Sequence, residues 1–182
     1  MKKIIVVYGL ISGAVATVMM FVTMLIADHI GFERGAYIGY TTIVLSLLLV
    51  PAGVKTYRDH YGDGQITFLR AFGVGLAITV ISCLCYVVAW EVLYYNFMPD
   101  FFDKYGAHMV TKLQAEGASQ AAIQKALADA QKFKQMYANP LINGAMTFME
   151  PFPVGLVIAL VSAGVLRKKA GPQGAAQAQV AV

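Results

Sequence analysis

Charged side chains are scarce in this sequence. Only 13% of its 182 residues are Asp, Glu, Lys or Arg, and 58% are hydrophobic, whereas a typical soluble domain carries roughly 25% charged residues. A surface with so little charge is poorly suited to water, so the composition favours lipid as the surrounding solvent. The length allows one domain and excludes a membrane bundle joined to a large soluble enzyme.

Groups that bind metals or cofactors are also scarce. Cys83 and Cys85 are two residues apart in an apolar run. They point to different sides of a helix, which favours neither a disulfide nor a metal pair. The sequence has no phosphate-binding P-loop, no dinucleotide fingerprint and no nucleophile elbow. We therefore predict a non-enzymatic protein with no metal site and no cofactor.

Four long apolar runs stand out against this background. A bilayer core of about 30 Å requires about 20 apolar residues in a helix, and four runs meet that length: 4–27, 36–54, 69–97 and 141–166. The first run is too long for the apolar core of a signal peptide, so we predict a retained helix. The expected fold is all-α, a four-helix transmembrane bundle in a single domain over 1–169. The small, polar residues 170–182 are predicted to form a disordered cytoplasmic tail.

The net charge is +4. We attribute the excess of Lys and Arg to membrane topology and predict no nucleic-acid partner. Lys and Arg are concentrated in the two short tails and in the segment 55–70, where they act as topology signals. Both termini are therefore predicted to be cytoplasmic, in a bacterial inner membrane. Lys55, Arg58 and Arg70 are expected to contact anionic lipid head groups, and a phosphate-ligand site is the alternative. Asp63 and Gly64 are typical of a tight turn.

Residues 99–138 predict an extracytoplasmic amphipathic helical hairpin between the third and fourth spans. Gly117 is suited to end the first arm and Ser119 to cap the second. Each arm carries an apolar stripe at helical spacing; the stripes are Phe102, Tyr105, Met109 and Leu113, and then Ile123, Leu127, Ala130, Phe133 and Tyr137. These stripes are expected to be buried against each other, the bundle or the outer leaflet, or to form a groove for a protein partner.

Small residues recur at a spacing of four in two of the spans. Gly9 and Gly13 lie in the first span, and Gly155 and Ala159 lie in the fourth. Such pairs allow close approach of helices in membranes. They predict close packing within the chain or homodimerisation through one of these faces.

The stretch around Glu150 places a carboxylate directly before Pro151 and Pro153 in an apolar span. Two prolines interrupt the helical hydrogen-bond ladder, so we predict a helix break there. Glu150 is then either the cap of a kinked outer helix end or a protonatable or cation-binding carboxylate in a cavity, together with Glu91 or Arg34. These three ionisable residues are our candidate functional residues.

Three stretches of the chain resemble a bacterial membrane family catalogued as domain-of-unknown-function family 4199. They are "GVKTYRDHYGDGQITFLRAFGVG" at 53–75, "MPDF" at 98–101 and "MEPFPVGLVIALVSAGVLRKK" at 149–169, and their order and spacing fit the family over most of positions 4–169. The resemblance implies four membrane helices and an outer loop between the third and fourth. It supplies no activity and no functional residue.

The leading functional hypothesis is a non-enzymatic scaffold or modulator of a membrane partner. The alternative is a small transporter or ion-conducting oligomer that uses Glu91 and Glu150. The expected partners are the lipid bilayer and either a membrane protein or further copies of this chain.

Overall fold

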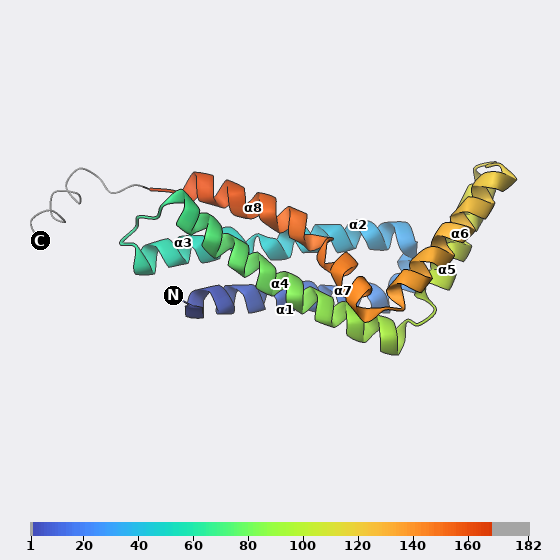
Figure 1. Cartoon of the computed structure of the whole chain (residues 1–182), viewed down its shortest axis with the longest axis horizontal. Helices are drawn as coiled ribbons and strands as arrows, with labels where there is room; N and C mark the ends of the chain where they lie inside the picture. The colour runs from blue at the N-terminus through green and yellow to red at the C-terminus, as the bar shows by residue number, and fades with distance from the viewer. Residues whose placement is uncertain (1, 169–182) are drawn as a thin grey trace, which may run out of the picture.

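The computed structural model describes residues 2–168, which form eight helices without a regular strand (Figure 1). The helices are α1 (Lys2–Leu25), α2 (Ala27–Leu47), α3 (Leu49–Tyr61), α4 (Phe68–Phe97), α5 (Phe101–Ala115), α6 (Gln120–Tyr137), α7 (Pro140–Phe148) and α8 (Pro151–Leu166). The predicted all-α class is confirmed. The predicted disordered tail at 170–182 lies outside the described residues.

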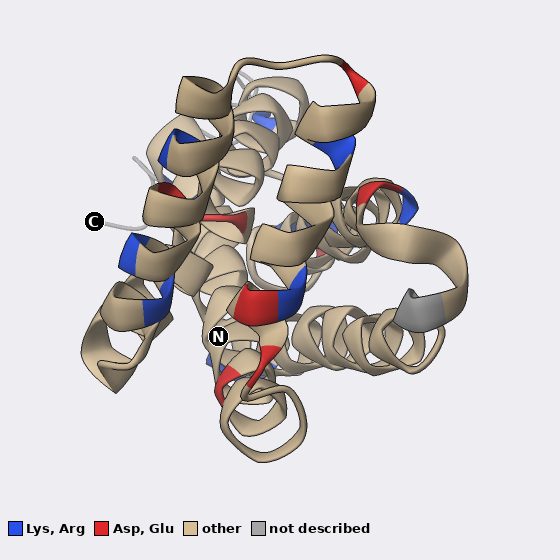
Figure 2. Ribbon diagram, turned by 90° about the vertical axis from the view of Figure 1, so that its right-hand side faces the viewer, with Lys and Arg blue, Asp and Glu red and all other residues tan. Residues whose placement is uncertain are grey.

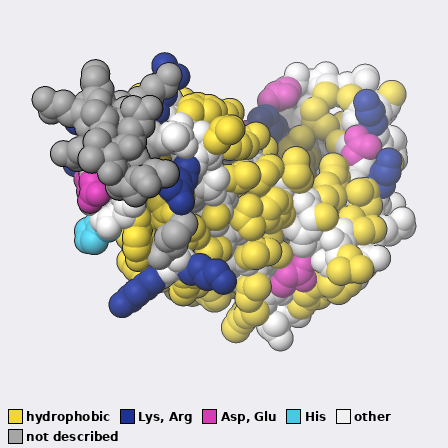
Figure 3. Space-filling view, turned by 60° about the vertical axis from the view of Figure 1, so that its left-hand side comes forward, with side chains coloured by type: hydrophobic (Ala, Val, Ile, Leu, Met, Phe, Trp, Pro, Cys, Tyr) yellow, Lys and Arg dark blue, Asp and Glu magenta, His cyan; other side chains and the backbone are white. Residues whose placement is uncertain are grey.

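Four of the rods in this fold are long and apolar enough to cross a membrane. They are α1, the rod His29–Tyr61 formed by α2 and α3, α4, and the rod Pro140–Leu166 formed by α7 and α8. The shortest has 24 residues, which at 1.5 Å per residue reaches about 36 Å, enough for a hydrocarbon core of about 30 Å. The bundle flank carries a broad hydrophobic surface (Figure 3), as lipid contact requires.

The second rod is longer than the run 36–54 from which it was predicted. The structure places no open loop at 28–35: α2 starts at Ala27, directly after α1, and its axis changes at Gly31, where φ is +76°. Glycine adopts this left-handed conformation without steric cost, so one residue redirects the chain. The polar residues here fall outside the predicted span because hydropathy marks where apolar character ends, whereas the helix continues past that point.

Helix α4 lies between α1 and α8 and contacts both along their small-residue faces. A Cβ added at Gly9 would collide with Ile81, and one added at Gly13 would collide with Cys85. On the other side Gly155 packs directly against Thr79, and Ala159 is fully buried. Both small-residue faces are therefore occupied by α4 of the same chain, so they are not free for homodimerisation.

Hydroxyl groups link the helices inside this tightly packed region. Ser12 donates a hydrogen bond to the Ser46 carbonyl at 2.8 Å and lies 3.0 Å from the Ser82 hydroxyl. All three serines are buried. Away from water such bonds join helices that share no hydrophobic driving force for association in lipid.

The predicted hairpin is formed by α5 and α6 and extends from one end of the bundle, at a steep angle to its long axis (Figure 1). Gly117 has a φ of +70° between the two arms, and the Ser119 side chain caps α6 by accepting a hydrogen bond from the Ala122 N–H. Charged side chains are spread over both arms (Figure 2), among them the Lys134–Asp103 ion pair that connects them. We refer to the end of the bundle that carries α5 and α6 as the hairpin end and to the opposite end as the terminal end.

Aromatic contacts fix the base of the hairpin to the bundle. The Phe102 ring lies 4.7 Å from Tyr137 and 6.0 Å from Tyr94 of α4, measured between ring centroids. The Tyr95 hydroxyl donates a hydrogen bond to the Tyr137 carbonyl at 2.8 Å. Burial raises the pKa of the Tyr137 phenol, which therefore stays neutral.

A second attachment joins α5 to α2. Phe32 lies 5.7 Å from the Tyr105 ring and 5.3 Å from the His108 ring. Next to it, Lys112 donates a hydrogen bond to Glu33, an interaction that raises the pKa of Lys112. The hairpin is thus held to the bundle on two sides.

We predict that Gly155→Ala destabilises the bundle, because the new methyl group meets Thr79 where the helices are already in contact. Overpacking of this kind costs about 1–3 kcal/mol. The matched control is Gly164→Ala on the same helix, where a Cβ has no atom within 4 Å. Thermal unfolding in detergent should show a lowered midpoint for Gly155→Ala alone; equal midpoints for both variants would contradict this packing.

Candidate functional site

The fourth rod is interrupted at Met149 and Glu150. Helix α7 ends at Phe148, and α8 begins at Pro151, with both prolines in its first turn. The chain stays close to helical here, since the Met149 N–H reaches the Ala145 carbonyl at 3.2 Å and Glu150 has φ −73° and ψ −59°. The Glu150 side chain makes no capping hydrogen bond, so the capping role expected from the sequence is wrong.

Glu150 instead connects α8 with α4. Its Oε2 accepts a hydrogen bond from the Tyr86 hydroxyl at 3.1 Å. The carboxylate lies at the surface of the bundle. Tyr86 had no role in the sequence interpretation, because nothing in its spacing indicates a partner 64 residues further along the chain.

Asn143 is the most enclosed polar group of this region. It is fully buried, and its Oδ1 accepts hydrogen bonds from the Trp90 indole N–H at 2.9 Å and from the Thr147 hydroxyl at 3.2 Å. Two donors on the oxygen fix the orientation of the amide, and the Nδ2 group is then left without a partner. An amide inside an apolar run was the one sequence signal that could have identified this residue.

Glu91 faces the same α4–α7 interface. Its Oε1 is buried and has no hydrogen-bond partner. It lies against Gly144, where an added Cβ would be 3.5 Å from this oxygen. Together with Asn143, Glu91 gives the interface one unpaired acceptor and one unpaired donor. Each such group costs about 1–3 kcal/mol while it stays unpaired.

We define the hairpin-end polar cluster as Tyr86, Trp90, Glu91, Asn143, Thr147 and Glu150. Two of the three ionisable candidates from the sequence, Glu91 and Glu150, belong to it. Arg34 does not: it is exposed on α2, and among the side chains that the structure describes, those of residues 2–26 and 29–168, no carboxylate lies within ion-pair distance of its guanidinium. Within the same range no three His, Cys, Asp or Glu side chains form a group that could hold a metal ion.

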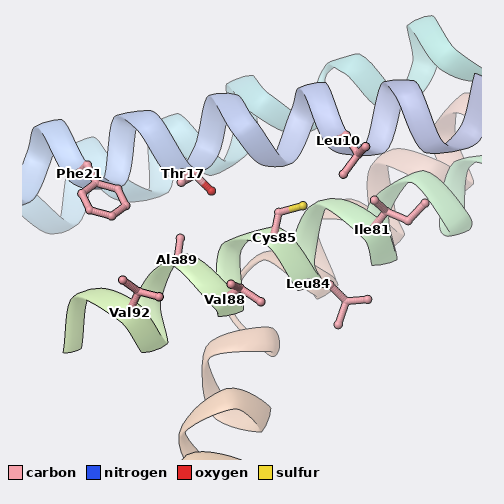
Figure 4. Close-up of a pocket in the computed structure, with 9 residues that line it drawn as sticks. All are labelled: Leu10, Thr17, Phe21, Ile81, Leu84, Cys85, Val88, Ala89 and Val92. Carbon is pink, nitrogen blue, oxygen red and sulfur yellow. The ribbon is translucent and has the colours of Figure 1, made fainter. Parts of the chain in front are cut away.

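An apolar groove runs along the flank of the bundle between α1 and α4 (Figure 4). It has a volume of about 530 Å³, and Thr17 and Cys85 are its only side chains that carry an oxygen or a sulfur. It opens widely to the surroundings of the bundle, where acyl chains would contact it. The groove offers shape and apolar surface but no charged group for recognition.

The basic residues expected at lipid head groups lie at the terminal end. Arg58 forms an ion pair with its neighbour Asp59 at 2.7 Å, and Lys55 is exposed. The predicted tight turn is confirmed, because Asp63 and Gly64 both have positive φ, +48° and +77°. Helix α4 follows it directly, and its first turn carries Arg70.

Comparison with known proteins places the chain in a family. A family model described as "Protein of unknown function (DUF4199)" matches residues 7–168. The chain belongs to the DUF4199 family. The matched range includes α1 from Val7 onward, the other three membrane-length rods, the hairpin and the polar cluster. No curated protein and no solved structure matches this DUF4199 chain.

We predict that Asn143→Ala destabilises the protein by about 1–3 kcal/mol, because the buried Trp90 N–H loses its acceptor. Trp90 is the only tryptophan in the chain, so its fluorescence reports on this bond directly. The emission maximum should move to shorter wavelength when the indole loses its partner. Thr147→Val is the control, since it removes one donor and leaves the indole bond in place; an equal spectral shift in both variants would argue against the arrangement.

Proposed function

We propose that this DUF4199 protein is a non-enzymatic scaffold of the bacterial inner membrane, with both termini cytoplasmic and a hairpin on the outer side that holds a protein partner. The orientation is supported by the terminal end, where the α3–α4 turn and the described ends of α1 and α8 lie together (Figure 1). Basic side chains gather at this end (Figure 3). Cytoplasmic ends of membrane helices are enriched in Lys and Arg.

The observation that carries the scaffold proposal is the double attachment of the hairpin. Phe102 and Tyr137 fix its base to α4, and Phe32 and Lys112 join α5 to α2. A projecting arm with a fixed orientation loses little conformational freedom when a partner binds, so more of the contact energy appears as affinity. Leu127, an apolar side chain 36% exposed on α6, is available for such contact.

Phe102 has a different role from Leu127. Both belong to the apolar stripes, for which the sequence left burial and a partner groove open. Phe102 is only 9% exposed and packs in the aromatic cluster at the hairpin base, as the burial alternative expects. A polar substitution there would loosen the hairpin and leave the cause of any lost binding ambiguous. Leu127 therefore tests the surface and Phe102 does not.

We predict that the wild-type protein is recovered with a protein partner when it is purified from its native membrane in mild detergent, and that Leu127→Glu loses this partner. The control is Ala128→Glu, which adds the same charge at the next exposed position on a different side of α6. Recovery of the wild-type protein alone would contradict the scaffold. Equal loss in both variants would assign the effect to charge and not to the Leu127 contact.

A second candidate function is transport of protons or small cations through the bundle. It is favoured by two buried polar atoms without a partner on the facing helices α4 and α7, Oε1 of Glu91 and Nδ2 of Asn143, because ionisable groups in membrane spans commonly mark ion pathways. In this case Glu91 binds the transported species at the α4–α7 interface, and Glu150 lies at the surface of the same region.

Flux measurements distinguish the two functions. If the protein transports protons, proteoliposomes with an internal pH indicator will show flux that Glu91→Gln abolishes, since a neutral amide cannot exchange a proton. Asp129→Gln on the exposed side of α6 is the control and should keep the flux. The scaffold proposal instead predicts only the leak of protein-free vesicles for every variant.

A further inference from the structure

A polar pocket lies at the terminal end of the bundle, far from the hairpin-end polar cluster. The end of α3, the turn after it, the first turn of α4 and the segment after α8 together enclose about 270 Å³. Its polar lining comes from Tyr61, Gln65, Thr67, Arg70 and Lys168. This volume is below the roughly 300–1,000 Å³ of pockets for drug-sized ligands, so the pocket suits a small polar group.

Backbone hydrogen bonds build the pocket. The Ile66 N–H donates to the Lys168 carbonyl and the Lys168 N–H donates to the Ile66 carbonyl, both at 3.0 Å. This reciprocal pair fixes Lys168 beside the start of α4, although α8 has already ended at Leu166. Gly62 is required for the turn on the other side, because a Cβ there would collide with the Gln65 carbonyl. Lys168 is therefore positioned by the fold.

The charge of the pocket is unbalanced. Arg70 and Lys168 line it, whereas none of its lining residues is acidic. Within residues 2–168 neither cation has a carboxylate at ion-pair distance, and Asp59, the acidic residue at the end of α3, is paired with Arg58. Two cations from segments almost 100 positions apart in the sequence thus face one small volume, which attracts an anion.

The donor set matches a phosphate group. The guanidinium of Arg70 presents a planar fork that suits two phosphate oxygens, and the Lys168 ammonium adds a point charge. The Thr67 hydroxyl already accepts a hydrogen bond from the Arg70 N–H at 3.4 Å and keeps its own proton to donate. The start of α4 adds the positive end of a 30-residue helix.

We propose that this pocket binds a phosphate ester anion. The surroundings place the pocket at head-group depth: Leu69, beside Arg70, is 78% exposed, and Tyr61 and Phe68 are also exposed. An anionic phospholipid would put its phosphate in the pocket and its acyl chains along these apolar side chains. A soluble phosphate ester carries the same recognised group, and the experiment separates these two sources.

The test uses the full chain in detergent and native mass spectrometry with phosphatidylglycerol and phosphatidylcholine of the same acyl chains. The wild-type protein should retain phosphatidylglycerol in preference to phosphatidylcholine. The double variant Arg70→Gln, Lys168→Gln should bind phosphatidylglycerol at least about tenfold more weakly, because each charge-assisted hydrogen bond to phosphate contributes roughly that factor. The control is Lys125→Gln, Lys132→Gln, which removes the same charge from exposed positions of α6 and should bind as the wild type does.

Competition with inorganic phosphate identifies the source of the anion. If inorganic phosphate displaces phosphatidylglycerol from the wild type, the pocket takes soluble phosphate; if it does not, the lipid head group is the ligand, and both results support the site. Equal retention by the wild type and the pocket variant would overturn the proposal, as would equal losses in the pocket and control variants. Lys168→Gln alone keeps the test valid if the double variant is unstable, since the bridge to Ile66 uses only backbone atoms.

Discussion

The close approach of α1 and α8 to α4 is the contact on which the rest of this fold depends. Lipid gives apolar helices no reason to associate, so their packing must come from van der Waals contact and a few internal hydrogen bonds. Gly13 and Gly155 bring the α1 and α8 backbones against α4 on two sides, near enough for Ser12 to reach Ser46 and Ser82. Because α4 is held in this way, its two ends have defined neighbours: the basic pocket at one end and the polar cluster with the hairpin base at the other.

The features of the fold that depend only on residues close together in the sequence could be predicted. Apolar length indicates a membrane span whatever its partners, and Gly117, Ser119 and the Asp63–Gly64 turn act within a few residues of themselves. The second span was misjudged because a helix continues through polar residues once its hydrogen-bond ladder is established, and Gly31 redirects it without a loop. The burial expected for the Phe102 stripe is confirmed, but its partner Tyr94 could not be named from the sequence. The capping role of Glu150 was wrong because its partner, Tyr86, is distant in sequence, and no local pattern reports such pairing.

The candidate site was only partly accessible from the sequence for the same reason. Glu91 and Glu150 were identifiable as carboxylates in apolar runs, but the group that gives the cluster its character is Asn143, whose amide is fixed by Trp90 and Thr147. Arg34, the remaining ionisable candidate, is directed away by the course of α2. The unsatisfied amide and carboxylate mark the place where this tightly packed bundle tolerates a local energetic cost. Costs of this kind are often retained for a functional reason.

The break at Met149 and Glu150 also divides the fourth rod into two parts. Helix α7 is a separate nine-residue helix, and only Ala138 and Asn139 separate it from the hairpin arm α6. Along the chain, the first contacts with α4 that follow the hairpin are therefore those of Asn143 and Gly144. The hairpin and the Glu91 carboxylate, which lies against Gly144, are in this way neighbours along one continuous stretch of chain, on the far side of the proline break from the rest of α8.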